Sequence, residues 1–583
     1  MSNHQLLSYL SCLYSPLGAG SRSNASTVDG GKWVNRRNFL TSISAAALAA
    51  AGASEALGEL TPSRPQPQAK PRGPATPDQP NLLFIISDQH RAGVSKRSGY
   101  PFDTTPTLDR LAARGIDFQR SYCTSPACVP SRVSMLTGRW PDAHRVRMNL
   151  DAKEAFFEKD LYGVAREQGY ITGLAGKNHT YLTPDRVDFW REYGHSKGYI
   201  PPNAPPAYRE FEEWLGDTGF NVTQQPTPFP LEVQHPYRIV SDAIEFLDNA
   251  GAQRFCLQVS FPEPHDPEQV SEPYWNMFPP ESLPDRLAGP EALKRMGFRE
   301  NWLHQLALTT FPDSDTAWRR YVSNYLGALR MIDDQLKRLL DHMEKTGQIE
   351  NTVIVVLADH GDYLMEYGLP RKGVGLPECL TRIPMVWAGP GIRPNADLNA
   401  DAHVSMADLM PTFCEFMGAA IPHGVQGRSL KPLLLGQPLP NDEFRSVYVT
   451  AGLGGLYYDE KDKVPYSVAR RGTSNWDELN MVTQSGNQKM VRMGDWKLIY
   501  DMMGYGQLYH LPSDPAELTN RFADPDAARP REALLAELLM WTIRNQDSLP
   551  TGPQNRKYET KWPAAHNWYA PYRKVDPGMP FRP

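Results

Sequence analysis

The chain of 583 residues is too long for one ordinary hydrophobic core, so two domains are the default expectation. Its composition, with 40% hydrophobic and 22% charged residues, is that of a globular protein, and its six cysteines are too few and too scattered for a framework of disulfide bonds. A formal net charge of −5 gives no reason to expect a nucleic-acid partner, which requires a basic face, but it leaves room for a small basic pocket that takes an anionic substrate.

The amino-terminal segment has the pattern of an export signal. The pair Arg36 and Arg37 precedes a mildly apolar, alanine-rich run, and a small-residue cleavage pattern follows at 51–53. The apolar run falls short of the ~20 residues that a membrane-spanning helix needs. We therefore predict a leader with a twin-arginine signal peptide at 1–58 and a proline-rich linker at 59–80. The protein would then be bacterial and periplasmic or secreted, and the twin-arginine translocation machinery would export it. An amphipathic helix with a chance arginine pair is the weaker alternative.

Beyond the linker, segments with the pattern of strands alternate with segments that have the pattern of helices. A short continuous apolar run is typical of a strand buried on both faces, whereas apolar residues three or four positions apart indicate a helix. The predicted strands are 81–86, 254–261, 352–358 and 383–391, and the predicted helices are 105–115, 238–249 and 325–343. This alternation predicts an α/β fold over residues 81–427, with a large, mostly parallel sheet sandwiched by helices.

The helix at 105–115 carries start and stop signals. Thr105 is placed to cap the first turn, Pro106 suits the first helical position, and Gly115 ends the helix.

The pattern changes in the carboxyl-terminal part of the chain. An alternating hairpin at 489–501, a further strand from residue 507 and an amphipathic helix at 531–546 predict a smaller α+β domain over 428–550. The tail at 551–583 is rich in aromatic residues and proline but too poor in aliphatic residues to form its own core. We expect it to pack against the body of the protein or a neighbouring chain, and the sequence predicts no oligomeric state.

Two acidic residues directly follow predicted strands. Asp88 stands after the strand at 81–86, next to Gln89, and Asp359 follows the strand at 352–358, next to His360. Because ligands of such sheets bind outside the carboxyl ends of the strands, both carboxylates are expected at one edge. Carboxylates suit a hard divalent cation, whereas the ordinary role of Asp-His-Gly after a strand is a helix cap.

Cys128 lies in the segment SYCTSPACVPSRVSMLTGR, where Pro130 and the apolar residues after it predict the start of a helix. The free N–H groups of a helix start and the charge of Arg132 favour an anion there and would lower the pKa of a thiol. Cys128 has four possible roles: a nucleophile, half of a disulfide with Cys123, a metal ligand, or a residue that is modified. So tight a disulfide loop is uncommon, and no partner stands at a usual metal-ligand spacing. The chemistry of these residues alone does not separate the four.

The segment CVPSRVSMLTGR resembles the signature of the formylglycine-dependent sulfatases, in which the cysteine of Cys-x-Pro-Ser-Arg is oxidised to an aldehyde. The likeness covers essentially the whole chain beyond the linker, with segments in family order: SDQ, TPTLDRLAARGIDF, GYITGLAGKNH, PEPHDP, ADHGDYLMEYGLPRKG, IPMVWAGPG and MVRMGDWKLIYD. The resemblance implies the fold of the alkaline-phosphatase-like hydrolases and the activity of a sulfuric ester hydrolase.

By this resemblance Cys128 is a precursor rather than a working thiol. A formylglycine-generating enzyme oxidises it to a formyl group, which hydrates to a geminal diol. One diol oxygen then attacks sulfur and displaces the alcohol. The second hydroxyl gives up its proton, the aldehyde re-forms, and sulfate leaves by C–O cleavage.

The resemblance also implies a metal ion held by Asp88, Gln89, Cys128, Asp359 and His360. Many relatives have an acidic residue in place of Gln89 and asparagine in place of His360. Two carboxylates balance the charge of the ion, so less negative charge repels an anionic substrate. The nitrogen of His360 makes Mn²⁺ more suitable than it is at an all-oxygen site. We expect Ca²⁺, with Mn²⁺ or Mg²⁺ as alternatives.

Basic side chains complete the implied site. The family assigns Arg132 to the positive set and gives Lys177 and His179 the role of holding the diol and sulfate oxygens. His265 would protonate the leaving oxygen or bind sulfate, because a histidine pKa near ~6.5 suits an acid around neutrality. Lys372 would bind sulfate and share the acid role.

Two further stretches are candidates for substrate contact. Arg147 and Asn149 are placed to form a rim, and the region 183–236 is rich in tryptophan, tyrosine and proline. That region could line a sugar pocket, but the packing of surface loops explains it equally well.

These observations predict an exported sulfatase that hydrolyses sulfate monoesters of a carbohydrate. The first alternative is a phosphonate monoester hydrolase or phosphodiesterase, because such enzymes resemble this chain, use the modified cysteine and pair Asp-Gln with Asp-His around the metal. The second is a non-catalytic binder of sulfated glycans with Cys128 unmodified. The sequence identifies neither the sugar nor the sulfated position, nor endo or exo action.

Overall fold

The computed structural model describes residues 70–546, apart from gaps at 150–151, 220, 311–312, 374, 395–400, 438, 440–441, 453–468, 471–472 and 475–485. The predicted signal peptide at 1–58, the first half of the linker and the tail at 551–583 lie outside the described residues. The end of the linker hydrogen-bonds to the domain that follows it. The backbone N–H of Lys70 donates to the carbonyl of Glu167 at 2.9 Å, and the carbonyl of Gly73 accepts from the backbone N–H of Arg254 at 2.8 Å.

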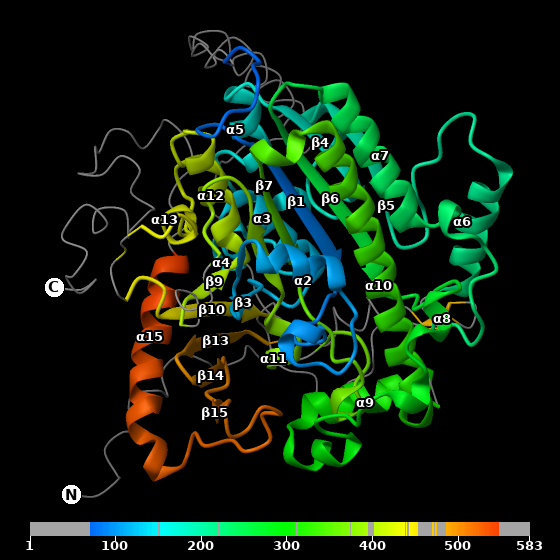
Figure 1. Cartoon of the computed structure of the whole chain (residues 1–583). Coiled ribbons are helices and arrows are strands. Elements are labelled where there is room, and N and C mark those ends of the chain that lie inside the picture. The colour runs from blue at the N-terminus through cyan, green and yellow to red at the C-terminus, as the bar shows by residue number, and fades with distance from the viewer. Residues whose placement is uncertain are drawn as a thin grey trace, which may run out of the picture. The chain divides into compact units, whose positions relative to one another are not determined.

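Seven of the described strands form the central sheet in Figure 1. Their spatial order is β2 (Ile116–Asp117), β8 (Met385–Ala388), β7 (Thr352–Ala358), β1 (Asn81–Asp88), β6 (Phe255–Pro264), β4 (Ile171–Lys177) and β5 (Phe189–Tyr193). β1 runs parallel to its neighbours β7 and β6, and β4 runs parallel to β6 and β5. Of these strands, β8 alone runs antiparallel to its neighbours β7 and β2. The predicted α/β fold with a mostly parallel sheet is confirmed.

Helices cover both faces of this sheet (Figure 1). One face carries α3 (Cys128–Thr137), α5 (Leu161–Glu167) and α12 (Leu409–Phe416), and the other carries α2 (Pro106–Ala113), α7 (His235–Ala250) and α10 (Ser314–Thr346). The side chains of β1 alternate between the two layers, with Leu82, Phe84 and Ile86 in the first and Leu83 and Ile85 in the second. Before residue 440 the remaining α-helices described are α4 (Pro141–His144), α6 (Pro206–Thr218), α8 (Tyr274–Met277), α9 (Phe298–Thr310), α11 (Glu378–Thr381) and α13 (Lys431–Leu434). Within residues 70–546, no described helix is long and apolar enough to cross a membrane.

The capping of α2 differs from the prediction. Thr105 occupies the cap position, but its side chain makes no capping hydrogen bond. A carboxylate of α10 takes this role, because Asp333 accepts hydrogen bonds from the backbone N–H groups of Thr107 at 2.7 Å and Leu108 at 2.9 Å. The free N–H groups at the start of α2 are thus satisfied from a distant part of the chain. Gly115 follows the helix because a Cβ there would lie 1.9 Å from a backbone carbonyl oxygen of β8.

The glycines of β4 explain why its pattern is not that of a buried strand. A Cβ on Gly173 would lie 2.7 Å from a phenylalanine ring of α7, and a Cβ on Gly176 would lie 1.9 Å from the carbonyl oxygen of Ser260. The close packing of β4 against its neighbours therefore requires residues that are poor strand formers. The parallel register pairs Lys177 with Tyr193, so the residues just beyond β4 and β5 lie side by side.

The carboxyl-terminal region contains a smaller antiparallel sheet among the described strands, in the order β10 (Ser446–Ala451), β13 (Gln488–Met493), β14 (Trp496–Asp501) and β15 (Gly506–His510). Helix α15 (Ala528–Gln546) packs on this sheet through a common hydrophobic core. The predicted hairpin and final helix are confirmed, whereas β10 was not predicted. Two short strand pairs complete the described sheets: β3 (Arg120–Tyr122) with β9 (His403–Ser405), and β11 (Ala469–Arg470) with β12 (Thr473–Ser474).

Buried charges join this smaller sheet to the α/β domain. Lys497 of β14 lies 2.8 Å from a carboxylate oxygen of Glu517 and 3.2 Å from one of Glu378, at the start of α11. Arg492 of β13 forms a second ion pair with Glu378 at 2.8 Å. We call Glu378, Glu517, Lys497 and Arg492 the inter-sheet cluster. The hydroxyl of Tyr122 donates to Glu378 at 2.9 Å.

Candidate active site

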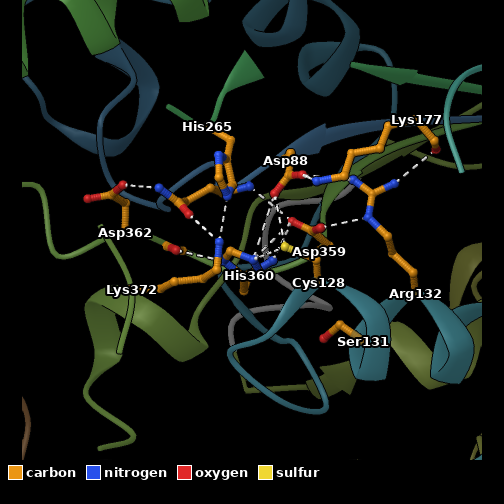
Figure 2. A network of polar contacts seen from close by, with 12 residues as sticks. Asp88, Cys128, Ser131, Arg132, Lys177, His265, Asp359, His360, Asp362 and Lys372 are labelled. Atoms are coloured by element: carbon orange, nitrogen blue, oxygen red, sulfur yellow. Dashed lines mark hydrogen bonds and ion pairs between the residues drawn. The ribbon is translucent and has the colours of Figure 1, made fainter. Parts of the chain in front are cut away.

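The candidate site lies at the carboxyl ends of the two central strands. Asp88 is the last residue of β1, and Asp359 and His360 directly follow β7. Because the parallel register pairs Ser87 with Ala358, these residues meet at one edge of the sheet, as the sequence predicted. Figure 2 shows them converging at the centre of a polar network, and all three are fully buried.

Cys128 reaches this edge from helix α3, of which it is the first residue. Its Sγ lies 3.2 Å from Nε2 of His360 and 3.6 Å from Oδ1 of Asp88. Asn149 caps the helix, because its Oδ1 accepts a hydrogen bond from the backbone N–H of Val129 at 3.1 Å. The predicted helix start is confirmed, and it directs the cysteine toward the two carboxylates.

Four side chains offer ligand atoms to a common point. One atom from each of Asp88, Cys128, Asp359 and His360 lies within 4.8 Å of the others, and we call these four residues the ligand group. Nδ1 of His360 lies 2.9 Å from the carbonyl oxygen of Gly361. A carbonyl can only accept, so Nδ1 carries the proton and the lone pair of Nε2 faces the carboxylates. Carboxylate oxygens and a neutral imidazole nitrogen suit a divalent cation, so this donor set fits the metal ion that the resemblance implies.

Gln89 adjoins these four residues and is oriented by its own contacts. Its backbone takes the left-handed conformation, with φ of 65°, and its N–H donates to Oδ1 of Asp359 at 2.9 Å. Its side-chain Nε2 donates to Asp362 at 2.6 Å, and its Oε1 accepts from Nζ of Lys372 at 2.9 Å. The amide oxygen is therefore held on the side that carries Lys372.

The thiol of Cys128 does not have the lowered pKa expected from the sequence. Burial raises its pKa to about 12, and the negative charge of Asp88 adds to this effect, whereas Lys372 and Lys177 oppose it too weakly. A disulfide with Cys123 is not formed either: that thiol is buried and lies 3.8 Å from the carbonyl oxygen of Leu380. With no cation in the ligand group, an unmodified thiol at this position stays protonated at neutral pH and is a poor nucleophile.

Arg132 and Lys177 form the positive side of the network, on the right of Figure 2. Nε of Arg132 donates to Asp359 at 2.7 Å, and one of its terminal N–H groups donates to the hydroxyl of Ser260 at 2.8 Å. Lys177, at the end of β4, forms an ion pair with Asp88. Burial alone would raise the pKa of Asp88, but the neighbouring cations, Lys177 first, hold it well below its ordinary value.

Lys372 and His265 lie on the opposite side of the metal-type ligands (Figure 2). His265 follows β6 and Lys372 lies in the loop beyond β7, and Nζ of Lys372 is 2.6 Å from Nε2 of His265. Nδ1 of His265 is 2.9 Å from the carbonyl oxygen of Asp266, so this nitrogen is the donor. The lysine is then the donor at Nε2, and the pair holds its proton on Nζ of Lys372.

His265 and His179 have pKa values below the ordinary value for histidine, so both are uncharged near pH 7. Burial, followed by His195 and Lys372, places the pKa of His265 well below its ordinary value. Burial and then Lys177 do the same for His179. A histidine with its pKa lowered in this way is not an acid by itself near neutrality, and the role of His265 as acid or sulfate ligand stays a prediction. Nδ1 of His179 is buried without a hydrogen-bond partner among the described residues.

One site residue, His195, was missed by the sequence analysis. It follows β5, and its Nε2 lies 2.6 Å from Nζ of Lys177. Its ring lies against that of His265, with centroids 3.9 Å apart, and edge-on to that of His179 at 6.4 Å. The signal was available, since His195 stands two residues after β5 just as His179 stands two residues after β4. Without β4 predicted, that correspondence could not be seen.

The two predicted rim residues have protein partners. Arg147 forms an ion pair with Asp142 at 2.6 Å and its side chain is 28% exposed. Asp142 also pairs with Lys489 of β13 at 2.8 Å, so this rim touches the carboxyl-terminal sheet. Asn149 serves as the cap of α3. Substrate contact by Arg147 and Asn149 stays a prediction.

The fold and the site define a class before any comparison is made. The mostly parallel sheet places two carboxylates, an imidazole and a cysteine at one edge, and lysine and arginine side chains surround them. This arrangement is that of a metal-dependent hydrolase for anionic esters.

Comparisons with known proteins place the chain within this class. The sulfatase family profile matches residues 80–419. An arylsulfatase of Clostridium perfringens is 26% identical over 468 residues, which cover 76% of this chain and 90% of that protein. An N-acetylglucosamine-6-O-sulfatase of Bacteroides thetaiotaomicron is 24% identical over 531 residues, covering 78% and 85%. The solved structure of a phosphonate monoester hydrolase from Silicibacter pomeroyi superposes with a TM-score of 0.65 at 22% identity, covering 82% of this chain and 100% of that chain.

The chain therefore belongs to the sulfatase family and is a sulfuric ester hydrolase. The family carries with it a metal ion and a formylglycine derived from cysteine, for which the ligand group around Cys128 provides the place.

Proposed function

We propose that this protein is an exported sulfatase that hydrolyses sulfate monoesters of a carbohydrate, using a formylglycine made from Cys128. The observation that carries the proposal is the excess of fixed positive charge around that residue. Arg132 and Lys177 contact the carboxylates of Asp359 and Asp88. Lys372 donates to the amide of Gln89, whose N–H group contacts a third carboxyl group, Asp362. Burial raises the pKa of Asp362 to about 7, so this group carries less than a full negative charge at neutral pH. A divalent cation adds to this excess, and a sulfate monoester anion offsets it.

The residues that would hold the metal are Asp88, Asp359 and His360, with Gln89 and the modified Cys128 completing the set. Ca²⁺ is our choice, with Mn²⁺ and Mg²⁺ as alternatives. When bound, the ion would supply charge that polarises the ester and the nucleophile. The formyl group, once hydrated, would supply the attacking oxygen.

The side chains of this site have separable tasks in that reaction. Arg132 is fixed by Asp359 and Ser260, so its charge stays at the start of α3 beside the nucleophile position. His179 has an unpartnered buried Nδ1 that suits a sulfate or diol oxygen. On the far side, Lys372 keeps a proton 2.6 Å from Nε2 of His265, and this pair is placed to deliver it to the leaving oxygen.

The carbohydrate substrate is supported by the relative that acts on N-acetylglucosamine-6-O-sulfate, and the region 183–236 contributes His195 to the site. Export is supported by the twin-arginine pattern within residues 1–58, which points to the periplasm or the medium of a bacterium. A formylglycine-generating enzyme and the twin-arginine translocation machinery would then act on the chain during its maturation.

The second candidate function is hydrolysis of phosphonate monoesters or phosphodiesters. Two observations favour it: Gln89 and His360 stand where many sulfatases have an acid and an asparagine, and the fold superposes on a phosphonate monoester hydrolase. A phosphonate monoester carries one negative charge, as a sulfate monoester does, so the cation excess does not separate the two.

The test compares kcat/KM for an aryl sulfate and an aryl phosphonate monoester with the same leaving group. We expect the sulfate to be preferred by at least about tenfold, which is about 1.4 kcal/mol of transition-state stabilisation. A preference for the phosphonate would overturn the proposal in favour of the second candidate. A panel of sulfated mono- and oligosaccharides then identifies the sugar and the position.

A further inference from the structure

The side chain of His195 closes a ring of contacts around the site. Lys177 joins Asp88 to Nε2 of His195, and Lys372 joins Gln89 to Nε2 of His265. Asp88 and Gln89 are consecutive, and the two imidazole rings lie 3.9 Å apart at an angle of 31°. Two lysine–histidine pairs therefore contact the consecutive residues Asp88 and Gln89, and the two histidine rings of these pairs contact each other.

We infer that His195 is a positioning residue that holds the ammonium of Lys177 in the sulfate site. A lysine ammonium has donors but no acceptor, so Nε2 of His195 accepts the hydrogen bond and the imidazole is neutral. One N–H of Lys177 is directed to Asp88 and a second to His195. The third is left at a fixed angle for an anion, whereas a free lysine would sample many orientations.

The turn that carries His195 is itself fixed. It follows β5, and Tyr193 pairs with Gly198 across it, while the N–H of Gly194 donates to the carbonyl of Lys197 at 2.7 Å. The N–H of Gly198 donates to Glu212 at 2.9 Å, and a Cβ on Gly198 would lie 2.6 Å from the Tyr193 ring. The imidazole is thus held by a rigid turn, as positioning requires.

Three substitutions separate the hydrogen bond from the ring stack. His195→Ala removes both, His195→Gln keeps an acceptor near the position of Nε2, and His195→Phe keeps a ring beside His265 without an acceptor. Lys197→Ala, at an exposed side chain of the same turn, is the matched control.

The inference rests on the proposed function for its activity readout, so kcat/KM of each variant is measured relative to wild type on whichever ester wild type prefers. We expect a loss of about 10- to 100-fold for His195→Ala and His195→Phe, the factor for a hydrogen bond to a charged group. His195→Gln should stay within about fivefold, and Lys197→Ala should match wild type.

A second readout does not depend on turnover. Inorganic sulfate should raise the melting temperature of the wild-type protein, because a ligand that binds only the folded state stabilises it. The rise should be similar for His195→Gln and smaller for His195→Ala. If wild type hydrolyses neither ester, the proposed function fails while the sulfate shift still tests the inference. If His195→Ala keeps wild-type activity and sulfate shift, or His195→Phe outperforms His195→Gln, the inference is overturned.

Discussion

The protein contains two buried groups of charged side chains, which differ in the balance of positive and negative charge. The inter-sheet cluster pairs Lys497 and Arg492 with Glu378 and Glu517, at distances between 2.8 and 3.2 Å. These four residues hold two cations and two carboxylates, and the part-exposed Arg382 lies 3.7 Å from Glu378 at the margin of the cluster. The cluster joins two parts of the fold.

The site around Cys128 has the opposite balance. Arg132 and Lys177 contact Asp359 and Asp88, and Lys372 donates to Gln89, which also contacts Asp362. Burial raises the pKa of Asp362 to about 7, so three full positive charges face two full negative charges and one partial one. Buried charge is costly unless it is compensated, so an excess of cations is retained only where an anion arrives. The comparison teaches that burial of charge alone does not mark a site, whereas its imbalance does.

The largest effect is expected from removing the sulfur at the centre of the imbalance. Cys128→Ala should lower kcat on the preferred ester at least about 10⁴-fold, because the covalent step loses its nucleophile. Cys123→Ala is the matched control, since that buried thiol lies outside the ligand group. Steady-state kinetics on the two purified variants measures both, and equal losses would contradict the assigned role.

Removal of the metal ion should cause the second-largest loss of kcat. Exhaustive dialysis against a chelator should reduce kcat at least about 10³-fold, because Asp88 and Asp359 would be left without the ion that their oxygens face. Readdition of Ca²⁺, Mn²⁺ or Mg²⁺ in turn should restore it, and the order of recovery identifies the metal. Full activity with no metal detectable by elemental analysis would contradict this account.

Breaking the balanced cluster should change stability rather than catalysis. Lys497→Met leaves Glu378 and Glu517 buried without their shared cation, and we expect a loss of about 3–5 kcal/mol in the free energy of unfolding. Lys337→Met, in an exposed pair with Asp341, should cost less than about 1 kcal/mol. Denaturant titration compares the two. At a permissive temperature kcat/KM of both variants should stay within a few-fold of wild type.

Acid should weaken the same cluster in a defined pH window. Burial alone would raise the pKa of Glu378, but Lys497 and Arg492 lower it from 4.5 to about 2. The stability that this depressed pKa contributes is complete above pH 4.5 and is lost as pH falls toward 2, by up to about 3 kcal/mol. Glu517, whose pKa burial raises, offsets part of that loss. Glu378→Gln should show a flatter stability profile between pH 4.5 and 2 in denaturant titrations, and an unchanged slope would contradict the assignment.

The smallest effects are expected at the rim. Asn149→Ala removes the cap of α3 and should cost about 1 kcal/mol of stability with a few-fold loss in kcat, because the helix start carries Cys128. Arg147→Ala breaks only a part-exposed pair with Asp142, so a change in stability below about 1 kcal/mol is expected. A rise in KM for an oligosaccharide but not for an aryl sulfate would show that Arg147 contacts the sugar.

Much of the fold could be predicted because its central strands are long apolar runs between strong helix patterns. β1, β6, β7 and β8 were all predicted, and the resemblance located the ligand group. β4 was missed because close packing requires glycine at positions 173 and 176, and glycine has a low strand propensity. The domain boundary at 427–428 stays a prediction.

Some features of the site depend on tertiary contacts that a sequence does not display. The raised pKa of Cys128 follows from burial against Asp88, which outweighs the helix start and Arg132. Asp333 replaces Thr105 as the cap of α2, although it lies 225 residues beyond Leu108, whose N–H group it accepts from. His195 enters the site only because β5 lies in register with β4.

The central claim is that Cys128 works as an aldehyde in a site built for an anion. Mass spectrometry of the proteolytic peptide that carries Cys128, from an active preparation made in the presence of a formylglycine-generating enzyme, tests it most directly. The account predicts a peptide lighter by about 18 Da than the cysteine form, because an aldehyde oxygen replaces the thiol. An active preparation in which Cys128 is entirely thiol would contradict it.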